Sequence, residues 1–192
     1  MDKIFDLIKW IDNPFKLLAV LLVGVVAGLG FIVYQNQDIF LSHVQHNLML
    51  KEKDVLVKES KALLRDTTAK AVVVHEIHVK QNERITHVAI ASDGSRNPGL
   101  EGYTVSLFNN GSNNRNKATI AMIRGEVYCA EFKSSSKVGK WMDYHNVKYL
   151  CRAPIGPLGQ LHGYIAIGFE RKPDDLISAK SRALIAAKEM CK

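Results

Sequence analysis

Residues 147–155, VKYLCRAPI, and residues 161–169, LHGYIAIGF, are two apolar stretches near the end of this 192-residue chain. The four residues Gly-Pro-Leu-Gly at 156–159 lie between them. Two strand-like stretches separated by a short segment rich in glycine and proline are typical of a β-hairpin. The sequence therefore predicts an antiparallel pair of strands, from which the rest of the fold can be developed in both directions.

The residues that follow this hairpin favour a helix. Residues 173–175, Pro-Asp-Asp, place acidic side chains where the partial positive charge of a helix N-terminus stabilises them. Four apolar or small residues then recur along one face, namely Ile177, Leu184, Ala187 and Cys191. We expect this face to pack against the sheet.

The residues before the hairpin add further strands. The stretches 69–79 and 84–92 are rich in β-branched residues, and 102–108 and 125–132 have a similar pattern. Residues 117–124 are compatible with either a helix or a strand, whereas the polar segments 109–116 and 134–140 predict loops. The expected fold class is α+β, an antiparallel sheet flanked by helices, over residues 67–192.

The N-terminal part has a different character. Residues 17–34, LLAVLLVGVVAGLGFIVY, carry no charge, and 18 residues of helix extend about 27 Å, close to the roughly 30 Å hydrocarbon core of a bilayer. We therefore expect a single transmembrane helix at 15–34. An amphipathic cytoplasmic helix is expected at 1–14 and a connecting helix at 35–66, with a self-associating stalk as the alternative for the latter.

The distribution of lysine and arginine predicts the orientation. Lys3, Lys9 and Lys16 precede the apolar run, whereas residues 35–50 contain neither lysine nor arginine. The positive-inside rule then places the N-terminus in the cytoplasm and the C-terminal domain in the periplasm. The net charge of +7 comes from scattered basic residues, which favours a solvated surface and excludes nucleic acid as the expected partner.

Gly24 and Gly28 form a GxxxG step within the predicted membrane helix. Two helices can approach closely along such a face, and close packing drives association in lipid, where no hydrophobic force does so. This favours a homo-oligomer. The alternative is that these glycines reflect only the general abundance of glycine in membrane helices.

The chain contains three cysteines, Cys129, Cys151 and Cys191. In an oxidising compartment this number allows one disulfide and one free thiol. We favour Cys151–Cys191, because the last helix should pack back on the sheet. A Cys129–Cys151 pair across neighbouring strands and three unpaired core cysteines remain open.

No arrangement of residues predicts catalysis, a cofactor or a metal. His75 and His78 are three residues apart on a predicted strand, so that their side chains point to opposite faces. The carboxylates of the predicted strands form no evident acid–base pair, and no nucleophile elbow is present. We expect a protein that is not an enzyme.

Residues 149–169, YLCRAPIGPLGQLHGYIAIGF, and residues 174–188, DDLISAKSRALIAAK, resemble the closing strands and helix of the lysis holins of T-even-type bacteriophages. Residues 102–108, GYTVSLF, resemble an earlier strand of that family, and the order of helix, membrane span and exported domain is similar. Cys151 matches a family cysteine, whereas the second family cysteine falls nearer Lys180 than Cys191.

The resemblance implies a holin that accumulates in the host inner membrane and then forms timed lesions that release an endolysin. It also implies that the exported domain binds an antiholin. The same strand–turn–strand–helix ending resembles GAF- and PAS-like sensor domains. The alternative function is therefore a membrane-anchored sensor or regulatory module that binds a small ligand or a partner.

Overall fold

The computed structural model describes residues 13–35, 50–108 and 113–192. The chain divides into two compact units, Met1–Asn47 and Leu48–Lys192. The first contains helix α2 (Pro14–Gln35), whose described apolar side chains are exposed, Leu22 by 60% and Val23 by 68%. In the described ranges, no helix reaches the combination of length and hydropathy that a membrane span requires. The transmembrane helix at 15–34 therefore stays a prediction.

Other N-terminal predictions are tested only in part. The predicted helix at 1–14 lies outside the described residues, apart from its last two. Of the predicted connecting helix, residues 36–49 also lie outside them, and the described helix α4 covers only Lys53–Asp66. Leu50 instead makes an isolated antiparallel bridge with Cys191. Residues 53–66 of the predicted range are therefore helical and residues 50–52 are not, whereas the connecting role of this segment stays a prediction.

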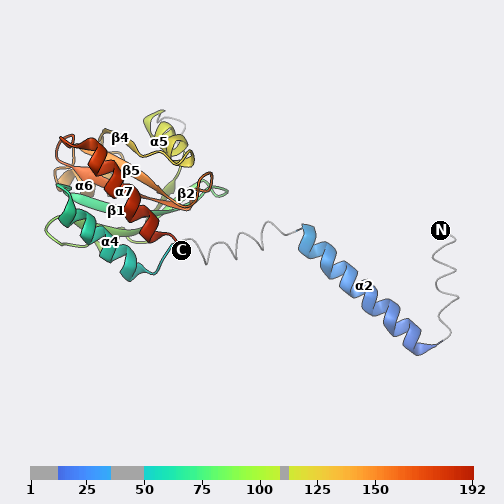
Figure 1. The fold of residues 1–192 in the computed structure, drawn as a ribbon. Coiled ribbons are helices and arrows are strands. Elements are labelled where there is room, and N and C mark those ends of the chain that lie inside the picture. The colour runs from blue at the N-terminus through green and yellow to red at the C-terminus, as the bar shows by residue number, and fades with distance from the viewer. Residues whose placement is uncertain (1–12, 36–49, 109–112) are drawn as a thin grey trace. The chain divides into compact units, whose positions relative to one another are not determined.

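The second unit is built on one six-stranded sheet in which all neighbours are antiparallel (Figure 1). The order across the sheet is β3-β2-β1-β6-β5-β4. The predicted hairpin is confirmed, since β5 and β6 pair from Tyr149–Phe169 to Ile155–Gly163. The strands are β1 (Ala71–His78), β2 (Glu83–Ala91), β3 (Thr104–Ser106), β4 (Tyr128–Glu131), β5 (Tyr149–Ile155) and β6 (Gly163–Phe169).

Helices cover both faces of this sheet. Helices α4 and α7 (Leu176–Met190) lie side by side over one face, here called the α4–α7 face (Figure 1). The other, the α5–α6 face, packs against α5 (Asn113–Ile123), α6 (Lys137–Tyr144) and the short 3-10 helix η1 (Pro98–Leu100). Because side chains alternate along a strand, Val72 and Val74 enter one core and Val73 enters the other. The expected α+β class is therefore confirmed for this unit.

Helix α7 packs only in part through the side expected. Ala187 is buried and Cys191 packs against the core, as expected, whereas Ile177 is 83% exposed and Leu184 41% exposed. The buried side chains are mostly small: Ala179, Ala183, Ala186, Ala187 and Met190. Alanines allow the helix backbone to lie close to the sheet and to α4, where longer side chains have no room. The acidic start is confirmed, because the Asp175 side chain accepts a hydrogen bond from Ser178 N at 2.9 Å.

Two predicted loops are partly helical. Residues 137–140 form the first turn of α6, because the Ser136 side chain caps it by accepting a hydrogen bond from Gly139 N at 3.1 Å. Of the predicted loop at 109–116, residues 113–116 belong to α5 and the first four lie outside the described residues. The ambiguous stretch 117–124 is helical as far as Ile123.

The disulfide joins Cys129 to Cys151, so the favoured Cys151–Cys191 pairing was wrong and the cross-strand alternative is correct. Cys129 on β4 lies directly opposite Cys151 on β5, with 4.1 Å between the Cα atoms. Antiparallel pairing thus aligns these two thiols without any contribution from a helix. Cys191 follows the last turn of α7 as a free, half-buried thiol.

We predict that the denatured, non-reduced chain exposes one reactive thiol, which peptide mapping assigns to Cys191. Cys129→Ser should lower the free energy of unfolding by about 2–4 kcal/mol, because it removes the cross-link between β4 and β5. Cys191→Ser is the matched control and should change it by less than about 0.5 kcal/mol. A mapped Cys151–Cys191 peptide would contradict the structure.

Candidate functional site

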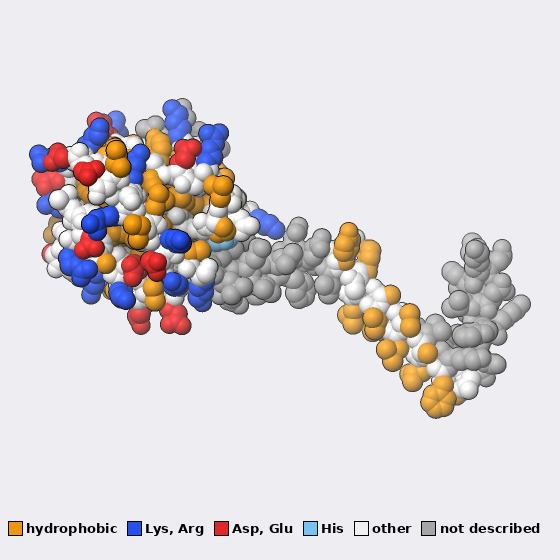
Figure 2. Space-filling model, viewed as in Figure 1, with side chains coloured by type: hydrophobic (Ala, Val, Ile, Leu, Met, Phe, Trp, Pro, Cys, Tyr) orange, Lys and Arg blue, Asp and Glu red, His pale blue; other side chains and the backbone are white. Residues whose placement is uncertain are grey.

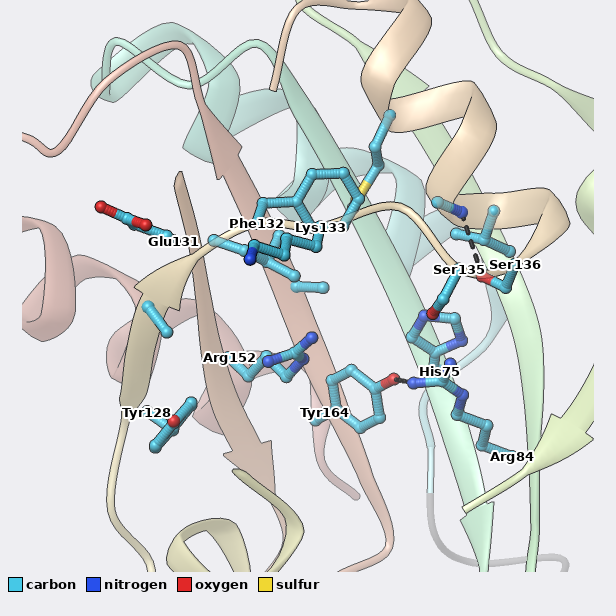
Figure 3. Close-up of a pocket in the computed structure, with 16 residues that line it drawn as sticks. His75, Arg84, Tyr128, Glu131, Phe132, Lys133, Ser135, Ser136, Arg152 and Tyr164 are labelled. Atoms are coloured by element: carbon cyan, nitrogen blue, oxygen red, sulfur yellow. Dashed lines mark hydrogen bonds between the residues drawn. The ribbon is translucent and has the colours of Figure 1, made fainter. Parts of the chain in front are cut away.

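A cavity of about 370 Å³ lies against the α5–α6 face of the sheet. Its walls come from the five strands other than β3, from residues 132–136, which connect β4 to α6, and from α6 itself (Figure 3). Ligand pockets in proteins have volumes of roughly 300–1,000 Å³. The cavity is therefore large enough for a small molecule.

Arg84 supplies the most deeply buried charge of this cavity. It lies on β2 and only 9% of it is exposed. Its Nη1 donates a hydrogen bond to the hydroxyl of Tyr164 on β6, and the guanidinium lies 6.0 Å from the centre of the Tyr164 ring. Figure 3 shows the two side chains meeting at one end of the cavity. Strand β1 lies between β2 and β6 in the sheet, so the two side chains meet across it.

His75 on β1 forms the wall beside this pair. It is opposite Tyr164 in the β1–β6 register, and the centres of the two rings are 4.6 Å apart. Its Nδ1 lies 3.2 Å from Oγ1 of Thr86 on β2. The register between β1 and β2 shifts between Val74 and His75, and this shift places His75 opposite Thr86. Burial lowers the pKa of His75 well below its usual value, and the nearby charges of Arg84 and other basic groups lower it further. His75 is therefore a neutral hydrogen-bonding group at neutral pH.

The charges around the cavity are unbalanced. Arg84, Arg152 and Lys133 line it, and Glu131 is the acidic residue among the lining residues. Glu131 is exposed, and Figure 3 shows its carboxylate pointing away from both arginines. The Nε of Arg84 is buried and has no hydrogen-bond partner among the described residues. Removing a guanidinium from water costs several kcal/mol unless its charge is compensated, so this end of the cavity favours negative charge.

The remaining walls combine apolar and polar side chains and include the loop at 132–136. Phe132, Met142 and Leu150 line the cavity together with small residues of β4 and β6. The loop is held at both ends: Phe132 N donates to Lys148 O at 2.8 Å, and Ser136 caps α6. Small-molecule sites usually combine apolar side chains with a few convergent polar groups, and both are present here.

The site residues predicted from sequence lie elsewhere. Cys151 belongs to the core of the α4–α7 face, and Cys191 lies at the end of α7. Gly24 and Gly28 lie on α2 in the other unit, and a Cβ added at either would meet nothing within 4 Å in the structure. Their role in helix packing stays a prediction.

The two histidines of β1 do face opposite sides of the sheet. His75 lines the cavity, whereas Nε2 of His78 lies 3.6 Å from Oε1 of Glu76, beside the contact between Glu76 and His87. In the part of the chain that the structure describes, no three histidine, cysteine or acidic side chains are grouped as metal ligands.

The cavity residues Arg84, Arg152 and Tyr164 were not predicted from the sequence. The alternation in RITHVAIAS places Arg84 and Thr86 on the same side of their strand, which is a usable signal of an inward-pointing arginine. Tyr164 is 80 residues further along the chain. Only the strand order brings it to Arg84.

Comparison with known proteins places the fold. No family model and no curated protein matches the sequence. Among solved structures, the chain is similar to the GAF domain of a two-component sensor histidine kinase from Bacillus halodurans, at 12% identity over 73% of this chain and 94% of that one, with a TM-score of 0.52. It is also similar to residues 122 to 287 of a methyl-accepting chemotaxis protein, at 14% identity over 71% and 84% of the two chains, with a TM-score of 0.51. The second unit therefore has a GAF-like fold.

We predict that His75 makes stability depend on pH. An unfolded histidine titrates near pH 6.5. Because the pKa of folded His75 is lower, the unfolded chain takes up the proton first as the pH falls. The free energy of unfolding should thus decrease below about pH 6.5, by up to about 1.4 kcal/mol per pH unit, until the folded pKa is reached.

Urea unfolding of the detergent-solubilised chain at several pH values measures this slope. His75→Gln should remove the contribution. Thr86→Val is the matched control, because it keeps the imidazole buried and should retain the slope. An unchanged slope in His75→Gln would assign the effect to another group.

Proposed function

We propose that this chain is a membrane-anchored sensory or regulatory module whose GAF-like domain binds a small ligand in the cavity of the α5–α6 face. The observation that carries the proposal is the convergence of Arg84, His75 and Tyr164, from three strands, on one end of a cavity that apolar side chains also line. The similar structures come from a sensor histidine kinase and a chemotaxis protein, which is consistent with this role.

The anchor in this proposal is α2. Its described leucine, valine and phenylalanine side chains are more than half exposed, and water solvates such a surface poorly. A bilayer would bury them, with the N-terminal lysines on the cytoplasmic side. The Cys129–Cys151 disulfide agrees with an exported domain, because disulfides persist in oxidising compartments.

Blocking the cavity tests the ligand site. Ala130 lines it from the edge strand β4, so Ala130→Trp should fill the chamber while leaving the sheet paired. Thermal unfolding of the full chain in detergent, screened against small metabolites, should identify a ligand that stabilises the native protein. A ligand at about 100 times its Kd contributes about 2.7 kcal/mol, which raises Tm by several degrees. Ala130→Trp should lose this shift.

The matched control is Ala62→Trp, a half-buried alanine on α4 that lies over the opposite face of the sheet. It should retain the ligand-induced shift. A screen without any stabilising ligand, or one whose ligands stabilise Ala130→Trp as well as the native chain, would refute the ligand site.

A second candidate function, a phage holin, is favoured by the GxxxG spacing of Gly24 and Gly28 on α2. Residues four apart lie on one side of a helix, and a second copy of the helix can approach closely along two glycines. In this proposal the chain accumulates in the host inner membrane as a homo-oligomer and opens timed lesions. The GAF-like domain, exported to the periplasm, then serves as the docking surface for an antiholin.

Membrane potential distinguishes the two candidates when the chain is induced in a bacterium. A holin should collapse the potential abruptly after a lag, whereas a sensor module should leave it unchanged. If helix packing sets the lag, Gly28→Leu should change it, because the new side chain separates the helices. Val26→Leu, on the opposite side of α2, is the matched control. Equal lags in both variants would exclude the packing role.

A further inference from the structure

We propose that the cavity of the α5–α6 face binds a small organic anion, whose carboxylate or phosphate group pairs with Arg84. This inference rests on the proposed ligand-binding function and specifies its ligand class. It is carried by the burial of Arg84, by the chemistry of its neighbours and by the apolar side chains that line part of the cavity.

Arg84 differs from the other arginines whose ion pairs are seen. Arg65 and Arg96 lie 3.1 and 2.6 Å from Asp66 and Glu101, and Arg171 and Arg182 contact Asp174 and Asp66 at 3.4 and 3.5 Å. The side chains of all four are more than a third exposed. Arg84, by contrast, is nine-tenths buried and its hydrogen-bond partner is a neutral phenol. A buried guanidinium without a carboxylate is the arrangement that an anionic ligand completes.

The neighbours of Arg84 extend the same donor surface. The Tyr164 hydroxyl accepts from Arg84, which leaves its own O–H to donate. A guanidinium offers five N–H donors in a planar fork that matches the oxygens of a carboxylate or phosphate. Arg152 lines the same chamber from β5 and adds positive charge. His75 beside them is uncharged, because its pKa is lowered, so it carries no positive charge that would need an anionic partner of its own.

The walls indicate an organic ligand. Phe132, Met142 and Leu150 face the chamber, and its volume of about 370 Å³ exceeds that of an inorganic phosphate several times over. Bare phosphate would leave the apolar walls in contact with water. A molecule with one anionic group and a small aromatic or branched aliphatic body satisfies both ends of the chamber.

Matched pairs of probes test this inference. The full chain in detergent is unfolded thermally with benzoate or phenyl phosphate, with their neutral counterparts benzamide and benzyl alcohol, and with inorganic phosphate, all at equal ionic strength. The two organic anions should raise Tm, and the neutral probes and inorganic phosphate should not. A larger shift with benzoate indicates a carboxylate ligand, and one with phenyl phosphate a phosphate ester.

Two substitutions assign the effect to Arg84. Arg84→Met should weaken benzoate or phenyl phosphate binding about tenfold or more, measured by isothermal titration, because the paired donors are lost. Arg84→Lys, which keeps the charge without the fork, should bind with intermediate affinity. Arg182→Gln removes one positive charge on α7, at the other face of the sheet, and should bind as the native chain does.

The possible results separate the anion inference from the ligand site on which it rests. Unchanged affinity in Arg84→Met, or equal stabilisation by neutral and anionic probes, overturns the anion inference. If a neutral metabolite binds and Ala130→Trp abolishes its binding, the anion inference fails while the ligand site stands. If no probe or metabolite binds the native chain, both fail together.

Discussion

Strand β6 is the element on which the rest of the GAF-like unit depends. It is paired with β1 along one edge and with β5 along the other, and all seven of its residues are buried. Burying each isoleucine of this strand contributes roughly 1.5–3 kcal/mol. Two of its glycines are also required by packing, because a Cβ at Gly163 would lie 2.5 Å from the His75 carbonyl oxygen and one at Gly168 would lie 2.5 Å from Val147.

The same pairing constructs the cavity. Tyr164 of β6 is opposite His75 of β1, and Arg152 of β5 is opposite Ala166 of β6. Three neighbouring strands therefore present these side chains on one face at fixed spacings, and β2 adds Arg84 from the far side of β1. A site on paired strands holds its geometry better than one on loops, which suits recognition of a ligand. The loop at 132–136 completes the wall of the cavity.

Electrostatics separates this cavity from the rest of the surface. Figure 2 shows basic and acidic side chains interspersed over the visible face of the GAF-like unit, as expected for a solvated surface. Ion pairs such as Lys53–Glu101 at 2.7 Å and Arg96–Glu101 at 2.6 Å belong to this surface. Partial burial alone would raise the pKa of Glu101, but the hydrogen bonds from Arg96 and Lys53 and their charges lower it below its usual value. The cavity instead places Arg84, a buried basic group, beside the partly exposed Arg152 and the exposed Lys133. The net charge of +7 alone does not reveal this difference.

The sequence by itself determined the elements whose signals are local. Alternation and turn residues predicted the β5–β6 hairpin, and Asp175 marked the start of α7. The short connection between paired strands, here residues 156–162, and helix capping both involve residues close together in the chain. Only the tertiary structure decided which side of α7 is buried, that Cys129 pairs with Cys151, and that Arg84 meets Tyr164. These outcomes depend on strand order and on the space between layers, and contacts between residues far apart in the chain leave no periodic trace in the sequence.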